Sequence, residues 1–162
     1  EIGDLKTRVL DTRKTSPLLR FLEKEAVLIG GGVNHRMGLY DLIMLKDNHI
    51  DFAGGVEKAI IQTQDYLKSN NLDLKIEVET RNMDEVKEVL RIGGVHRIML
   101  DNFTYEMLAE AVNLIDGRFE TEASGGVNLA TVRAHAESGV DYVSVGALTH
   151  SVYNLDLSLK AL

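Results

Sequence analysis

The chain has 162 residues, contains no cysteine and carries a formal net charge of −7. This length fits a single domain over residues 1–162, and the lack of cysteine excludes disulfides, thiolate metal sites and a cysteine nucleophile. The acidic balance argues against a nucleic-acid partner and the lack of a long apolar run argues against a membrane partner, so we expect a cytoplasmic protein.

Short aliphatic runs alternate with longer segments of helical period, which is typical of parallel βα units. The predicted strands, in chain order, cover residues 8–11, 26–29 (the weakest), 42–46, 75–79, 97–101, 118–122 and 142–145. Helices are predicted in most of the gaps, and Asn82 and Thr104 are expected to cap two of them. Six or seven such strands can close into a barrel or form an open sheet, and periodicity alone does not separate these architectures.

Cationic residues are relatively concentrated in the first third of the chain. Residues 1–50 carry eight Lys or Arg against seven Asp or Glu, whereas residues 51–162 carry ten against eighteen. The early stretch contains the segment DTRKT at 11–15 and, after three glycines, the cluster Asn34, His35 and Arg36. In an acidic protein, such a cluster predicts binding of a small and highly charged anion.

Charged residues stand at the carboxyl ends of the predicted strands. They are Asp11 with Arg13 and Lys14, Lys46 with Asp47, Glu77 with Glu79, then Asp101, and then Glu122. Because parallel strands of an α/β fold end at one rim, we expect these side chains to converge on a single opening. Any one of them alone would be read as a solvated strand end, but the recurrence on five strands favours a site.

Two late segments rich in small residues are candidate phosphate loops. Residues 122–126 (EASGG) and 144–148 (SVGAL) each follow or close a predicted strand. Small residues let backbone N–H groups approach an anion closely, and barrels frequently build their phosphate site from the loops after the last two strands. The pair of loops therefore favours phosphate binding.

Carboxylates are better candidate metal ligands than the five histidines. Glu79 and Asp101, with Asp47 as a third candidate, offer the oxygen donors that Mg²⁺ prefers. The histidines lack the spacing of a zinc site, although His35 and His150 lie in site-like segments.

Seven segments, in order along the chain, resemble the quinolinate phosphoribosyltransferase family, also called nicotinate-nucleotide pyrophosphorylase (carboxylating). They are DTRKT (11–15), GGGVNHR (30–36), LKDNH (45–49), EVE (77–79), LDNF (100–103), EASGG (122–126) and VGALT (145–149). The resemblance implies an incomplete, TIM-like parallel β/α barrel of six or seven strands. It also implies a homodimer or larger homo-oligomer, in which an N-terminal sandwich domain, absent here, supplies an arginine across the interface.

The family reaction implied by the resemblance converts quinolinate and phosphoribosyl pyrophosphate to nicotinate mononucleotide, pyrophosphate and CO₂, with Mg²⁺, in de novo NAD biosynthesis. By position, a cationic pocket for quinolinate and pyrophosphate corresponds to Thr12, Arg13, Lys14, His35, Arg36 and Lys46. The groups assigned to catalysis are Lys14, Glu79 and Asp101, and the two carboxylates also face the ribose and the metal. The cradle of the 5′-phosphate corresponds to Ser124, Gly125, Gly126, Val145, Gly146 and Ala147, with His150 nearby.

Two other readings remain open. A lyase or isomerase acting on a sugar phosphate would explain the late glycine loops, but it does not explain the early Arg and Lys cluster. A ligand-binding fragment that is catalytically incomplete is the second alternative, because the N-terminal domain of the family is absent.

Overall fold

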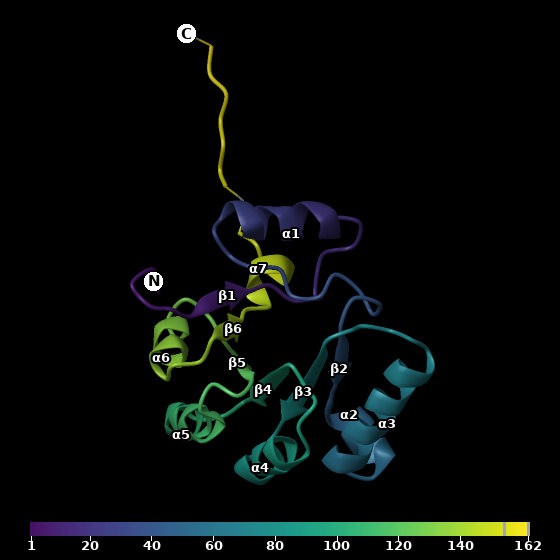
Figure 1. The fold of residues 1–162 in the computed structure, drawn as a ribbon. Coiled ribbons are helices and arrows are strands. Elements are labelled where there is room, and N and C mark those ends of the chain that lie inside the picture. Colours follow the sequence, from purple (N-terminus) through teal and green to yellow (C-terminus); the bar gives the residue numbers. More distant parts are fainter. Residues whose placement is uncertain (154, 162) are drawn as a thin grey trace.

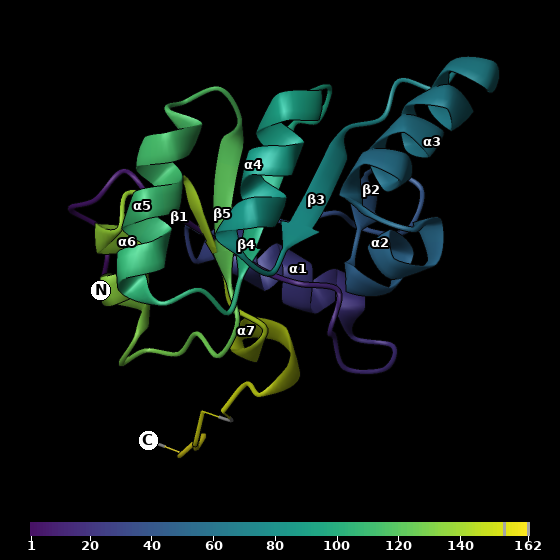
Figure 2. The same ribbon diagram turned by 90° about the horizontal axis from the view of Figure 1, so that it is seen from below.

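A computed structural model describes residues 1–153 and 155–161 of the chain. Its six parallel strands are β1 (Arg8–Leu10), β2 (Ile43–Leu45), β3 (Ile76–Thr80), β4 (Arg97–Asp101), β5 (Glu120–Ser124) and β6 (Tyr142–Ser144). Its helices are α1 (Arg20–Ile29), α2 (Asp47–Ala53), α3 (Val56–Ser69), α4 (Met83–Ile92), α5 (Tyr105–Ile115), α6 (Val132–Glu137) and α7 (Ala147–His150). The strands form one curved sheet in the order β1-β6-β5-β4-β3-β2, with the helices outside it (Figures 1 and 2).

The sheet curves like a barrel but does not close. Beyond β1, a single parallel bridge joins Leu10 to Val33, whose N–H donates to Val9 O at 2.8 Å. Within residues 1–153 and 155–161, no strand pairing joins Val33 to β2. The predicted incomplete β/α barrel is thus confirmed, with six strands and a seventh reduced to one bridge.

The strand predicted at residues 26–29 is wrong. These residues form the last turn of α1, in which Val27 is buried while Leu28 and Ile29 are exposed. Four consecutive apolar residues fit a short buried strand and the end of a helix equally well, so the pattern could not separate the two. The chain pairs with β1 at Val33, four residues after the end of α1.

The predicted strand at residues 118–122 begins two residues too early. The strand β5 starts at Glu120, because Arg118 caps the preceding helix: its guanidinium donates to Leu114 O at 2.8 Å and to Ile115 O at 3.1 Å. The two predicted N-caps are confirmed. Asn82 accepts from two backbone N–H groups of α4, and Thr104 accepts from one of α5.

The two faces of the sheet differ sharply in character. The face packed against the helices is apolar, with Val78, Ile98, Leu100, Ala123 and Val143 all in the main core. The opposite, inner face carries charged and polar side chains instead of the branched apolar residues that usually fill a barrel. None of the helices in the described part of the chain is both long and apolar enough to cross a lipid bilayer.

Candidate active site

A cavity of about 720 Å³ opens at the carboxyl ends of the strands. It brings together fourteen of the fifteen residues that the sequence predicts for the site: Thr12, Arg13, Lys14, His35, Arg36, Lys46, Glu79, Asp101, Ser124, Gly125, Gly126, Gly146, Ala147 and His150. Val145 does not line this cavity, because its side chain is buried in the main core. Segments more than a hundred residues apart thus share one opening.

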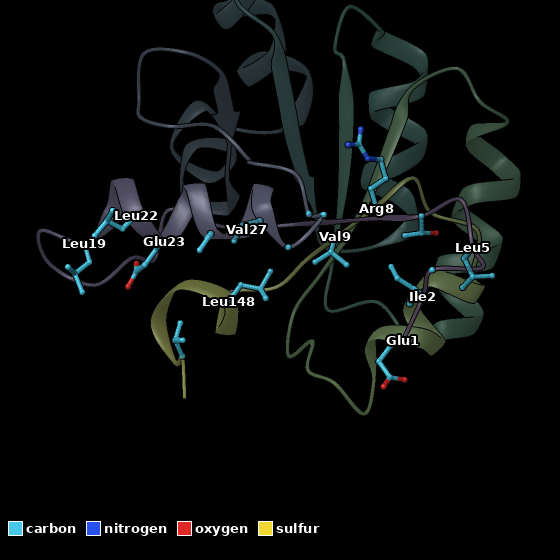
Figure 3. Close-up of a pocket in the computed structure, with 17 residues that line it drawn as sticks. Glu1, Ile2, Leu5, Arg8, Val9, Leu19, Leu22, Glu23, Val27 and Leu148 are labelled. Atoms are coloured by element: carbon cyan, nitrogen blue, oxygen red, sulfur yellow. The ribbon is translucent and has the colours of Figure 1, made fainter. Parts of the chain in front are cut away.

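A second cavity of similar volume lies on the outside of the sheet, between the N-terminal residues, α1 and α7 (Figure 3). Its walls are mostly aliphatic and include Leu19, Leu22, Val27 and Leu148. It lacks the convergence of cations and carboxylates found in the first cavity. A polyanionic ligand would therefore gain little there, and the candidate site is the cavity at the strand ends.

One wall of the candidate site is cationic and comes from early segments of the chain. Arg36 is partly buried, and its Nη1 donates to Leu42 O at 3.2 Å, which aims the side chain along the wall. Burial and the neighbouring Arg13 charge lower the pKa of Arg36 from its ordinary value. The Lys14 backbone is tied to α7 because Thr149 Oγ1 donates to Lys14 O at 2.8 Å.

The cavity is also lined by two carboxylates from neighbouring strands. Glu79 on β3 is 6 % exposed, and its Oε2 accepts from Lys46 Nζ at 2.8 Å. Asp101 ends β4 and accepts from Asn102 Nδ2 at 2.7 Å. Asn102 itself has a left-handed backbone with φ of 57°. The turn therefore orients the Asp101 carboxylate while Lys46 orients that of Glu79.

The glycines after β5 allow the rim to come close to this turn. Gly125 has φ of +106°, and a Cβ atom placed on it would lie 3.0 Å from Asn102 N and even closer to the Asn102 side chain. Gly126 also has a positive φ, +61°, but a Cβ atom there would meet no atom within 4 Å. Of these two glycines, Gly125 is the one required by space as well as by backbone conformation.

A matched pair of substitutions separates these two requirements. Gly126→Ala is expected to cost about 1–2 kcal/mol of unfolding free energy, the cost of a left-handed non-glycine residue. Gly125→Ala should cost a further ~1–3 kcal/mol, because the new methyl group forces the backbone of Asn102 to move. Urea unfolding measures both values, and equal losses for the two variants would contradict the close approach.

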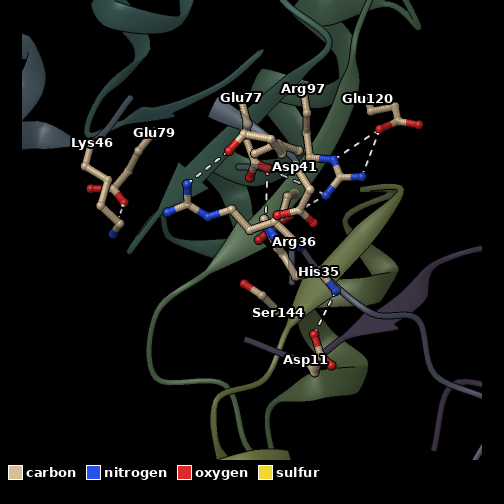
Figure 4. A network of polar contacts seen from close by, with 12 residues as sticks. Asp11, His35, Arg36, Asp41, Lys46, Glu77, Glu79, Arg97, Glu120 and Ser144 are labelled. Atoms are coloured by element: carbon tan, nitrogen blue, oxygen red, sulfur yellow. Dashed lines mark hydrogen bonds and ion pairs between the residues drawn. The ribbon is translucent and has the colours of Figure 1, made fainter. Parts of the chain in front are cut away.

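The floor of the cavity is a buried charged network. The sequence placed His35, Glu77 and Glu122 in the site but predicted neither their pairing nor the part of Arg97. Glu77 and Glu122 are fully buried. An oxygen of Glu77 lies 3.2 Å from His35 Nε2 (Figure 4), and an oxygen of Glu122 lies 3.4 Å from the same nitrogen. Arg97 Nη1 donates to Glu122 at 2.9 Å, and the same guanidinium pairs with Glu120. The prediction that Glu77 stands at the opening is wrong, since it lies below the cavity and does not line it.

The groups of this network shift one another's protonation. Burial and the Glu122 charge raise the pKa of Glu77 to about 7. Burial also opposes ionisation of Glu122, but His35 and Arg97 outweigh it and lower its pKa. For His35, burial disfavours the charged ring, but the Glu122 and Glu77 carboxylates outweigh it and raise its pKa to about 9. The Arg36 backbone N–H donates to His35 Nδ1 at 2.7 Å.

A second buried pair holds the backbone of His35 in place. Lys24 Nζ lies 2.7 Å from Asp11 Oδ1, and both side chains are at most 1 % exposed. The His35 N–H donates to the same Asp11 oxygen at 2.7 Å, while Lys24 donates to His35 O at 3.1 Å. The prediction that Asp11 faces the opening is therefore wrong. The Asp11 carboxylate is buried, and its contacts with Lys24 and the His35 N–H anchor the segment beyond Val33.

The residues fit a magnesium ion better at the rim than at the floor. Glu79 and Asp101 place two hard oxygen donors on adjacent strands of the open cavity, as Mg²⁺ with water and substrate ligands requires. At the floor, ligand atoms of His35, Glu77 and Glu122 lie within 4.8 Å of one another. The Arg97 guanidinium already lies 2.9 Å from Glu122 and 3.8 Å from Glu77, so this group is an ion-pair network.

Comparisons with known proteins agree with this geometry. The family model of the quinolinate phosphoribosyl transferase C-terminal domain matches residues 1–160. The chloroplastic nicotinate-nucleotide pyrophosphorylase (carboxylating) of Arabidopsis thaliana is 54 % identical over 94 % of this chain and 48 % of its own length. A probable enzyme of the same name from Synechocystis is 47 % identical over 98 % of this chain and 54 % of its own length.

Solved structures give the same result. The crystal structure of NadC from Streptococcus pyogenes superposes with a TM-score of 0.91 at 45 % identity, covering 99 % of this chain and 55 % of that one. The chain thus spans about half the length of the relatives that it matches. With a family model that covers nearly all its residues, this chain belongs to the quinolinate phosphoribosyl transferase C-terminal domain family.

Proposed function

We propose that the protein carrying this chain transfers the phosphoribosyl group of phosphoribosyl pyrophosphate to quinolinate, releasing pyrophosphate and CO₂ and forming nicotinate mononucleotide. The observation that carries the proposal is the single cavity in which a cationic wall, two carboxylates and two glycine-containing loops face one another. Family membership supports it, because the matched relatives are named for this activity.

The cationic wall suits both substrates. Quinolinate presents two carboxylates on one ring, and the leaving pyrophosphate carries several negative charges. Arg13, Lys14, Arg36 and Lys46 place four cationic side chains around the same cavity. Arginine can bind a carboxylate through two parallel hydrogen bonds, whereas lysine acts as a point charge. We assign the quinolinate carboxylates to the arginines and Lys14, and the 5′-phosphate to the rim at Gly125 and Gly146.

Glu79 and Asp101 act on the ribose in this proposal. When the bond from ribose C1 to pyrophosphate breaks, positive charge develops on the ribose and the two fixed carboxylates stabilise it. The quinolinate ring nitrogen then forms the new bond to C1, so no covalent bond to the protein is needed. The alkylated ring is cationic and accepts the electron pair when the carbon–carboxylate bond breaks, and a proton takes the place of the departing CO₂.

We assign Mg²⁺ to the same two carboxylates, because Glu79 and Asp101 offer the oxygen donors described above. The ion would neutralise part of the pyrophosphate charge. Lys46 keeps the Glu79 carboxylate in position through its 2.8 Å contact. Asn102 does the same for Asp101 through the 2.7 Å hydrogen bond at the end of β4.

We also propose that the protein is a homo-oligomer. The outer side of α1 exposes Phe21 at 77 %, Leu22 at 65 % and Ile29 at 81 %, and association would remove this apolar surface from water.

The expected cytoplasmic location stays a prediction. Plant relatives are named as chloroplastic or mitochondrial, and those names describe the relatives alone.

The activity is tested with carboxyl-labelled quinolinate, phosphoribosyl pyrophosphate and Mg²⁺. We expect the intact protein to release labelled CO₂ and form nicotinate mononucleotide, and Asp101→Asn to lower kcat by on the order of 10²-fold, since it removes one stabilising charge. The control is Asp116→Asn, which changes a left-handed helix cap away from the cavity and should leave the rate unchanged. Consumption of a sugar phosphate without CO₂ release would favour the lyase or isomerase instead.

A further inference from the structure

Two cation-bearing loops meet in the wall of the cavity at the strand ends. The first loop, residues 12–15, carries Arg13 and Lys14, and the second loop, residues 36–42, begins with Arg36. Burial and then the Arg13 charge lower the pKa of Arg36, so the two guanidinium groups are close enough to repel each other. This repulsion favours separation of the loops, and a contact that joins them would keep the cations together.

Arg20, the first residue of α1, contacts both loops. Its Nη1 donates to Arg13 O at 3.0 Å and to Thr15 Oγ1 at 3.2 Å in the first loop. Its Nη2 donates to Met37 O in the second loop, the carbonyl of the residue that follows Arg36. Arg20 does not itself line the cavity. Its guanidinium therefore joins the two loops from outside the cavity.

The second loop is held as one unit by its own contacts. The Asp41 carboxylate accepts the N–H of Met37 at 2.6 Å and that of Gly38 at 2.8 Å. Arg36 Nη1 donates to Leu42 O at 3.2 Å, which connects the beginning of the loop to its end. A contact at Met37 O consequently fixes the position of the whole loop, including Arg36.

These contacts require the shape of an arginine side chain. A guanidinium holds five N–H donors in one plane, whereas the ammonium of lysine is a single compact group on a flexible stem. Two different nitrogens of Arg20 serve the two loops, and one ammonium nitrogen cannot replace both. A lysine at this position would keep the positive charge but lose the joint contact, so it separates the effect of placement from that of charge.

We propose that Arg20 is a positioning residue that joins the two loops and thereby sets the distance between Arg13 and Arg36 before the substrate binds. The inference rests on the proposed function where it concerns quinolinate, whose two carboxylates need cationic groups at a fixed separation. Joining the loops in advance lowers the entropic cost of ordering them around the substrate. Arg20 then affects quinolinate affinity although it does not line the cavity.

The first test observes the Arg20 guanidinium in the intact protein, without substrate or substitution. Nitrogen-15 NMR with labelled arginine distinguishes a guanidinium whose rotation is restricted from one that rotates freely. We expect separate Nη1 and Nη2 signals for Arg20, because acceptors on two loops hold the two nitrogens. A single averaged signal, as expected for Arg91 with its 61 % exposed side chain, would overturn the proposal whatever reaction the protein catalyses.

The second test compares the kinetics of Arg20→Lys with those of a matched control, Arg118→Lys. Arg118 also donates to two backbone carbonyls, those of Leu114 and Ile115, but it precedes β5 at the end of the sheet away from the cavity. We expect Arg20→Lys to raise the KM for quinolinate about five- to tenfold and to change kcat less than about twofold, the pattern of a lost binding contribution. Arg118→Lys should change both constants less than about twofold.

The third test follows amide hydrogen exchange in the same variants. In the Arg20→Lys variant we expect exchange in residues 12–15 and 36–42 to accelerate at least about tenfold, because the contact between the loops is lost. Exchange in β4 and β5 should stay as in the unchanged protein. Arg118→Lys should leave both loops unaffected.

The outcomes of these tests are distinct. An unchanged KM for quinolinate in Arg20→Lys would show that the charge at position 20 is sufficient, and it would contradict the positioning role. Faster exchange throughout the sheet would mean a general loss of stability and would contradict it too. If Arg20→Lys does not fold, the NMR signals of the unchanged protein decide. If the unchanged protein does not turn over quinolinate, the proposed function fails, while the NMR signals and the loop exchange still test the contact.

Discussion

Lys24→Met is expected to lower the unfolding free energy by about 3–5 kcal/mol, the range found when one partner of a buried ion pair is removed. Lys24 and Asp11 are 1 % and 0 % exposed in their side chains, with Nζ 2.7 Å from Oδ1. The substitution leaves the Asp11 charge buried without its cation and removes the donor to His35 O. Urea unfolding followed by circular dichroism measures the loss.

The control for this prediction removes the buried Asp11 charge and does not restore the cation. Adding Asp11→Asn to Lys24→Met removes the orphaned charge while the side-chain oxygen can still accept the His35 N–H. The double variant should therefore be more stable than the Lys24→Met single variant. A loss below about 1 kcal/mol for the single variant, typical of an exposed pair, would contradict the buried anchor.

Arg36→Ala is expected to weaken quinolinate binding at least tenfold. A hydrogen bond to a charged group contributes roughly 1.5–3 kcal/mol, which is about 10- to 150-fold in affinity. Arg36 lines the cavity and is oriented by its hydrogen bond to Leu42 O. Isothermal titration with quinolinate measures the change.

The matched control is Arg91→Ala, which removes an arginine whose guanidinium pairs with Glu57 on the surface at 2.8 Å. This variant changes the net charge by the same amount but should leave quinolinate affinity within twofold. An equal loss for both variants would mean that overall charge, and not the placement of Arg36, governs binding. Unchanged quinolinate affinity in the Arg36→Ala variant would show that Arg36 does not bind quinolinate.

The rim of the site was predictable because parallel strands end together. Once alternating strands and helices were recognised, Lys46, Glu79, Asp101 and the glycine loops had to face one edge, whatever the exact strand boundaries. The cationic cluster was visible as a local excess of Lys and Arg in an acidic chain. Fourteen predicted residues consequently share one cavity.

The floor of the site was not predictable in the same way, because pairing across a sheet depends on register. Glu77, Glu79, Glu120 and Glu122 alternate with residues of the other face, which signals that they share the inner face but not how deep each lies. Nothing in the sequence around Arg97 indicated that it belongs to the site. Its proximity to two buried carboxylates appears only when β3, β4 and β5 are placed side by side.

The anchor beneath the site was also hidden. Lys24 lies in an amphipathic helix among Glu23 and Glu25, where a lysine normally points to solvent. Its burial depends on the contact with Asp11, thirteen residues earlier, and on the segment after α1 running beside β1. The apolar run at the end of α1 concealed this arrangement by resembling a strand.

A crystal structure of the intact protein with quinolinate and inorganic phosphate is the most direct test of the proposed substrate site. We expect the pyridine carboxylates within hydrogen-bond distance of Arg36 and Lys14, and a phosphate against Gly125 and Gly146. Ligands found in the aliphatic cavity beside α1, or divided between separate openings, would contradict the claim that one cavity at the strand ends binds both.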